Sequence, residues 1–262
     1  MPVTLDGIVR RDRAVAGAAM LVLALLAWLY LFRMAAVPGH GMAGLTMDPA
    51  MPMPRAWSAR EVVLTFVMWA VMMVAMMIPA ASPMVLTFAT INRRRAASGA
   101  ATVPTAVFLA GYLVVWSAFS LGAALAQWGL QRAAVLAPSS LTVTPVVGGL
   151  LLVLAGAYQL TPLKSACLAR CQSPLGFILT EWREGTRGAF VMGLRHGAFC
   201  LGCCWALMTL LFVAGVMNLL WVAAIAALVL LEKLVPWGRA VSWATGVGLL
   251  GWGAWVLARS LA

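Results

Sequence analysis

Charged residues are scarce in this chain of 262 residues: Asp, Glu, Lys and Arg together make up 10% of it, and only seven residues are acidic. Histidine occurs only twice. The sequence also lacks a Walker-type phosphate loop, a Gly-x-Ser-x-Gly elbow and a candidate aspartyl-phosphate. The missing motifs argue against ATP-driven pumping and serine hydrolysis, and two histidines are too few for multi-histidine diiron sites or bis-histidine haem sites. One His and one Met would still suffice to ligate a single haem.

Hydrophobic residues make up 64% of the sequence and form several uninterrupted runs long enough to cross a bilayer. This pattern predicts an all-α fold, a polytopic transmembrane helical bundle of about seven spans. Pro79 and Pro83 remove backbone donors within the second run, so a kink or break is expected there and we describe the second span as broken. The predicted spans are residues 14–37, 61–92, 103–128, 141–163, 188–217, 219–235 and 240–257.

The formal net charge of +11 comes largely from Lys and Arg residues at the ends of these runs. Basic residues in such places set membrane orientation, so the partner they indicate is the lipid bilayer and not nucleic acid. We predict a cytoplasmic N-terminal segment, residues 1–13, followed by a single transmembrane helical domain, residues 14–262. Within this domain we expect a Met- and His-rich outer loop at 38–60 and a Cys-containing inner loop at 164–187.

Methionines are concentrated in the outer loop and in the second span. The loop contains His40 and Met42, and three further methionines follow. Thioethers are soft ligands that cannot be protonated, so together with an imidazole they suit copper in an oxidising compartment. Met72 and Met76 lie about one helical turn apart and would continue a ladder of thioethers through the span. Both groups also fit a packing role, which is the commoner one for a methionine stripe.

The strongest site pattern is the segment MGLRHGAFCLGCCW, residues 192–205. On a helix, His196, Cys200 and Cys203 fall within an arc of roughly 60°, with Cys204 about 40° beyond Cys200. A second pair, Cys167 and Cys171, lies in the expected inner loop. Thiolate and imidazole are ligands for copper(I), zinc or iron, so the two groups are candidates for one metal site. Thiol redox chemistry and simple packing of cysteine remain alternatives.

Glu232 and Lys233 are ionisable residues near the predicted inner end of the sixth span. We expect Lys233 to extend toward the aqueous interface. Glu232 is a candidate metal ligand or a counter-charge for Arg195, and a structural ion pair is an equally good interpretation.

Four segments resemble a bacterial family of unknown function described as predicted metal-binding integral membrane proteins. The segments are MMVAMMIPAASPM, YQLTPLKSACLARCQSP, HGAFCLGCCWALM and LLEKLVPWG. The resemblance covers roughly residues 61–257 and implies a multi-pass protein of the bacterial inner membrane. It also implies a set of metal ligands: Cys167, Cys171, His196, Cys200 and Cys203.

The hypothesis that follows is a copper(I)-handling membrane protein, active in uptake or in delivery to a partner, with zinc or iron as alternative metals. A metal chaperone or another membrane protein is the expected partner, and a homo-oligomer is compatible with the pattern. Two alternatives stay open: a membrane thiol oxidoreductase that uses the Cys pairs, and a non-enzymatic scaffold subunit. The absence of known catalytic motifs favours a non-enzymatic role.

Overall fold

A computed structural model describes residues 5–36, 58–99, 103–136 and 141–261 of the chain. These residues form an all-α bundle, as predicted, in which the described extended structure is one isolated bridge between Leu136 and Val143. The helices are α1 (Leu5–Ala36), α2 (Ala59–Ala97), α3 (Thr105–Arg132), α4 (Pro145–Gln159), α5 (Pro162–Gln172), α6 (Pro174–Glu181), α7 (Gly185–Thr209), α8 (Leu211–Ala214), α9 (Leu219–Leu234) and α10 (Gly238–Leu261).

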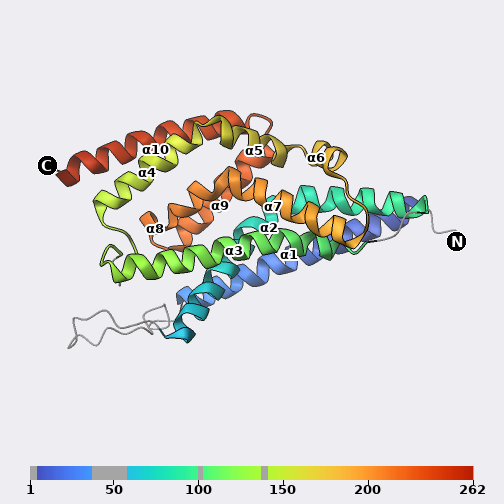
Figure 1. The fold of residues 1–262 in the computed structure, drawn as a ribbon, viewed down its shortest axis with the longest axis horizontal. Coiled ribbons are helices and arrows are strands. Elements are labelled where there is room, and N and C mark those ends of the chain that lie inside the picture. Colours follow the sequence, from blue (N-terminus) through green and yellow to red (C-terminus); the bar gives the residue numbers. More distant parts are fainter. Residues whose placement is uncertain (1–4, 37–57, 100–102, 137–140, 262) are drawn as a thin grey trace.

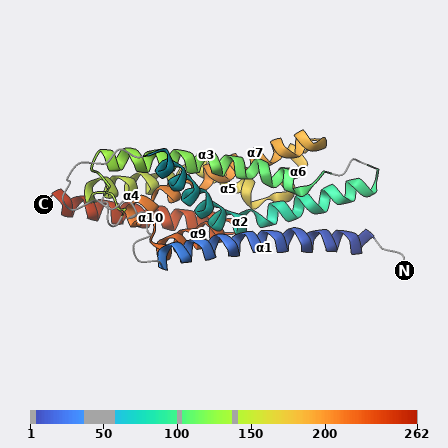
Figure 2. The same cartoon turned by 90° about the horizontal axis from the view of Figure 1, so that it is seen from below.

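The long helices α1, α2, α3 and α7 run along the long axis of the molecule (Figures 1 and 2). Helices α4 and α10 lie side by side along one edge, and α9 lies between this pair and α3 (Figure 1). Helix α9 ends, and α10 begins, near the middle of the long axis (Figure 1). The last turn of α9 therefore lies at mid-length of the molecule, where Glu232 and Lys233 are buried.

Five of the described helices are long and apolar enough to cross a membrane: α1, α2, α3, α10, and α7 together with α8. The pair α4 and α5, bent by 64°, adds a sixth span if it is counted as one. The protein is therefore a membrane protein. The sixth predicted span, residues 219–235, corresponds to α9, whose 16 residues reach only about 24 Å, short of the roughly 30 Å of a hydrocarbon core.

The second span has a kink at its prolines and not a break. Helix α2 is continuous through Pro79 and Pro83 and changes direction near its middle (Figures 1 and 2). Pro83 has no N–H to donate to the carbonyl of Pro79, and the hydroxyl of Ser82 donates to that carbonyl instead, at 2.8 Å. A neighbouring hydroxyl thus replaces the lost backbone bond, so the prolines bend the helix without ending it.

The segment expected as an inner loop, residues 164–187, is largely helical. Pro162 occupies the first turn of α5, and the Thr161 hydroxyl caps this helix by accepting from the amide of Lys164 at 3.2 Å. The bend between α4 and α5 turns one face of α5 toward the core and buries three residues spaced by about one turn: Lys164, Leu168 and Cys171.

Glycines bring α3 and α7 close together. A Cβ added at Gly193 would overlap the carbonyl oxygen of Phe108, and one added at Gly111 would overlap that of Phe190. Small residues at such crossings let two backbones approach each other in a membrane. The close approach brings Tyr112, on α3, against Cys200, on α7.

Candidate functional site

Four cysteines from α5 and α7 lie buried in the bundle core: Cys171, Cys200, Cys203 and Cys204. We call them the thiol cluster. The Sγ atoms of Cys203 and Cys171 are 3.9 Å apart, although 32 residues separate them in the chain. The thiols of Cys203 and Cys204 also donate to the carbonyl of Cys200, at 3.1 and 3.0 Å. The structure therefore brings one cysteine of the predicted C-x-x-x-C pair to the three cysteines of α7.

The α7 cysteines of the thiol cluster lie well inside that helix. Helix α7 begins at Gly185, so Cys200 lies about 22 Å along it. The segment containing Arg195 and His196 forms the middle of the helix.

The thiol cluster contacts the methionines of α2. The Sγ atom of Cys204 lies 4.0 Å from the Sδ atom of Met77. Met72 and Met76, the predicted ladder residues, are each only 1% exposed, and Met68 and Met73 on the same helix are fully buried. A continuous helix thus carries thioethers through the core as far as a cysteine thiol.

Cys200 differs from the other three cysteines because its sulfur contacts two polar side chains. The Nζ atom of Lys233 donates to the Sγ atom of Cys200 at 2.9 Å. The hydroxyl of Tyr112 lies 3.1 Å from the same sulfur and 3.2 Å from the carbonyl of Met77. The expectation that Lys233 extends to the interface is therefore wrong. Because α9 ends deep in the bundle, its last turn directs Lys233 inward, and the residue is 7% exposed.

His196 lies in an aromatic cage. Its ring stacks on Tyr112 with 5.5 Å between centroids, and Phe177 meets it edge-on at 5.6 Å. Its Nδ1 atom is buried and has no hydrogen-bond partner among the described residues. The ring is thus held by packing, while its role as a metal ligand stays a prediction.

Cys167 lies apart from the thiol cluster. It is half-buried and faces Gly202 on α7, where a Cβ would come within 2.9 Å of its Sγ atom. The glycine makes room for this side chain. Of the two cysteines of α5, it is Cys171 that joins the cluster, through its contact with Cys203.

Glu232 belongs to a buried ion pair. It accepts from Lys164 at 2.8 Å, with the two side chains 1% and 0% exposed, and from Gln159 at 3.2 Å. Arg195, its predicted counter-charge, pairs with Glu181 instead. The structural alternative considered for Glu232 is therefore the one that the geometry supports.

Among the described residues, no group of three or more His, Cys, Asp and Glu side chains is arranged to hold a metal ion. Two pairs of sulfur atoms, Cys171 with Cys203 and Met77 with Cys204, are spaced so that each could bind one metal ion. Atoms 3.9 or 4.0 Å apart subtend about 120° at an ion about 2.3 Å from each. Such an angle suits a trigonal ion, and thiolate with thioether suits copper(I). The predicted outer ligands His40 and Met42 lie outside the described residues.

A family model described as Copper chaperone, PpoB2, matches residues 66–256. The chain belongs to this family. No curated protein and no solved structure matches the chain. The matched region of this copper chaperone family contains the thiol cluster, the methionines of α2 and His196, but not His40 or Met42. Membership supports copper handling in general terms.

Two contact residues of this family member were missed as site candidates from the sequence: Tyr112 and Lys233. Lys233 carried a usable signal, because an ionisable side chain within an apolar run is costly unless it has a partner. Tyr112 carried none, since its place beside Cys200 depends on the approach of α3 to α7.

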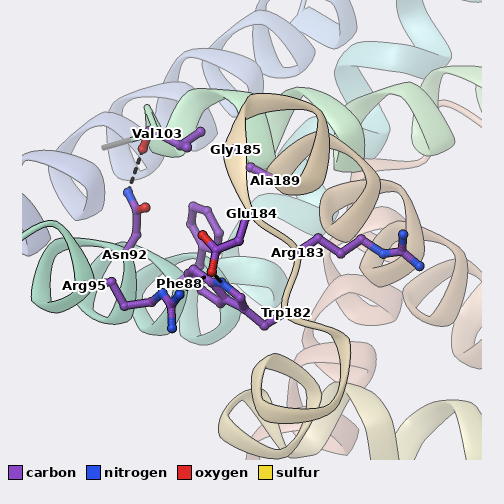
Figure 3. Close-up of a pocket in the computed structure, with 9 residues that line it drawn as sticks. All are labelled: Phe88, Asn92, Arg95, Val103, Trp182, Arg183, Glu184, Gly185 and Ala189. Carbon is purple, nitrogen blue, oxygen red and sulfur yellow. Dashed lines mark hydrogen bonds and ion pairs between the residues drawn. The ribbon is translucent and has the colours of Figure 1, made fainter. Parts of the chain in front are cut away.

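A separate small pocket of this family member lies at the C-terminal end of α2, where Figure 3 shows Arg95, Trp182 and Glu184 gathered together. Arg95 pairs with Glu184 and lies 4.8 Å above the ring of Trp182, whose indole N–H donates to Glu184 at 2.9 Å. The cavity, about 10 Å³, has room for about one water molecule. This group therefore fastens α2 to the connection between α6 and α7.

Proposed function

We propose that this protein is a membrane-embedded copper(I) chaperone that holds its cargo on buried sulfur atoms and delivers it to a partner protein. The observation that carries the proposal is the pair Cys171 and Cys203, whose sulfurs lie 3.9 Å apart in a water-poor core. Family membership supports copper as the cargo. Soft sulfur ligands favour copper(I) over hard cations.

The methionines of α2 form the proposed route to this pair. Met72 and Met76 are buried, and Met77 contacts Cys204, a neighbour of Cys203 on the same helix turn. Thioethers bind copper(I) more weakly than thiolates, so transfer from methionine to cysteine runs downhill. We propose that His40 and Met42 collect the ion outside the bacterial inner membrane, with the N-terminus in the cytoplasm, as the distribution of basic residues predicts.

The proposal is tested by titrating copper(I) into the detergent-purified protein under reducing conditions, against a chromophoric copper(I) chelator. We expect the wild type to bind copper(I) and the variants C171S and C203S to lose most of this binding. C167S is the matched control, because Cys167 lies on the same helix as Cys171 but faces Gly202. This control should bind copper(I) as the wild type does.

The proposal fails if the wild type binds no copper(I), or if C171S and C203S retain full stoichiometry. Parallel titrations with zinc and iron(II) separate the alternative metals, since a preference for either would replace copper as the cargo. Thiol trapping followed by mass spectrometry addresses the oxidoreductase alternative. A cycle between free thiols and a Cys171–Cys203 disulfide in metal-free protein would favour that alternative.

A further inference from the structure

Cys200 occupies a different chemical setting from the other cysteines of the cluster. Its sulfur is fully buried and lies where α3, α7 and α9 meet. Lys233 approaches it from α9 at 2.9 Å, and Tyr112 approaches it from α3 at 3.1 Å. Lys233 donates a hydrogen bond to the sulfur and the Tyr112 hydroxyl contacts it, so a lone pair that a metal ion would use is already engaged.

The partner of Lys233 is set by the end of α9. The preceding residue, Glu232, is the carboxylate nearest in sequence, but Lys164 and Gln159 already donate to it. Gln172 donates to the carbonyl oxygens of Glu232 and Val235, at 2.8 and 3.1 Å, and so ties the last turn of α9 to α5. With the backbone held in this way, the amino group of Lys233 is directed to Cys200.

We propose that Lys233 is a positioning residue that withholds the Cys200 sulfur from copper and thereby keeps the bound ion transferable. This inference rests on the proposed function, because it concerns the copper held by Cys171 and Cys203. The two sulfurs of that pair would subtend about 120° at the ion, which leaves one side of the ion open to a third ligand. Cys200 is the neighbouring thiol that would close this side.

Two physical effects act in the same direction. The hydrogen bond from Lys233 must be lost before Cys200 can bind copper(I), and the ammonium group repels a cation placed beside it in a medium of low dielectric. Both weaken the third metal–sulfur bond. A chaperone has to release its cargo. Because Lys233 competes with copper(I) for the Cys200 sulfur, it favours delivery of the ion over storage.

The test replaces Lys233 with an uncharged side chain of similar length, K233M, in the full-length purified protein. We expect K233M to bind copper(I) on the order of tenfold to a hundredfold more tightly, as expected for the loss of one hydrogen bond to a charged group. Release to a chelator should slow by a similar factor. X-ray absorption of the copper-loaded protein should show about one sulfur ligand more than in the wild type.

Two further variants isolate the mechanism. K233R keeps a cation at the position and should behave as the wild type does. The double variant C200S/K233M lacks the third sulfur and should return to wild-type affinity and sulfur coordination, which a purely structural role of Lys233 would not produce. If K233M does not fold, Y112F provides a second test, because it frees the Cys200 sulfur from its other polar contact while keeping the ring.

The inference is overturned if K233M, or Y112F in its place, matches the wild type in copper affinity, release rate and sulfur coordination. It is also overturned if C200S alone abolishes binding, since Cys200 would then be a ligand despite Lys233. These outcomes differ from failure of the proposed function, in which the wild type itself binds no copper(I).

Discussion

Glu232 and Lys233 are consecutive in the chain, yet their charged groups serve two different clusters. Glu232 accepts from Lys164 at 2.8 Å, and Lys233 donates to Cys200 at 2.9 Å. One turn of α9 therefore joins a buried ion pair to the thiol cluster. This relationship ties the stability of the core to the geometry of the proposed copper site.

Breaking the buried ion pair should destabilise the protein strongly. In E232Q, the ammonium group of Lys164 loses its counter-charge in the core, and we expect the free energy of unfolding to fall by about 3–5 kcal/mol. Denaturant unfolding in detergent, followed by circular dichroism, measures this change. The control is E184Q, which removes an exposed pair with Arg95 and should cost at most about 1 kcal/mol. Equal losses in the two variants would contradict the assignment of Glu232 to the core.

Removing one thioether should slow copper loading without unfolding the protein. In M77L the side-chain volume is nearly kept, so the expected loss of stability is below about 1.5 kcal/mol. Because Met77 is the α2 methionine that contacts Cys204, we expect severalfold slower copper(I) loading at unchanged final stoichiometry. Stopped-flow absorbance of the forming copper–thiolate bonds measures the rate. The matched control is M208L, at a fully buried methionine of α7, and a slowing there of the same size would argue against a route along α2.

Adding one methyl group at the crossing of α3 and α7 should separate the two helices. In G193A the new Cβ overlaps the carbonyl oxygen of Phe108, and the expected cost is about 1–3 kcal/mol. The matched control is G122A, on α3, where no atom lies within 4 Å of the added Cβ. This control should be neutral or more stable by up to about 1 kcal/mol, because alanine has the higher helix propensity. Thermal unfolding compares the two, and a neutral G193A would mean that the helices do not approach so closely.

The grouping of His196, Cys200, Cys203 and Cys204 on one helix follows from periodicity and could be predicted, since all of them lie on α7. The joining of Cys171 to this group was a hypothesis of the same prediction, and the 3.9 Å contact with Cys203 agrees with it. Cys167 was expected beside it. Four residues advance about 6 Å along a helix axis, so Cys167 lies one turn away from Cys171 and meets Gly202 instead.

The second span shows that prolines in a sequence do not by themselves decide whether a helix bends or ends. A proline removes one backbone donor, and that loss was the basis for expecting a kink or break. Whether a helix ends or bends depends on what replaces the donor, and here Ser82 donates to the carbonyl of Pro79. The same sequence pattern is compatible with either outcome.

The sequence by itself determined the all-helical membrane architecture, because a chain with 64% hydrophobic residues in long runs has to pair its backbone groups within helices. It also determined which sulfur residues share a helix face. Only the tertiary structure decided which helices meet, that α9 ends within the bundle, and that Lys233 therefore lies against Cys200. These contacts depend on side-chain volumes and glycine crossings between distant segments, which no local periodicity encodes.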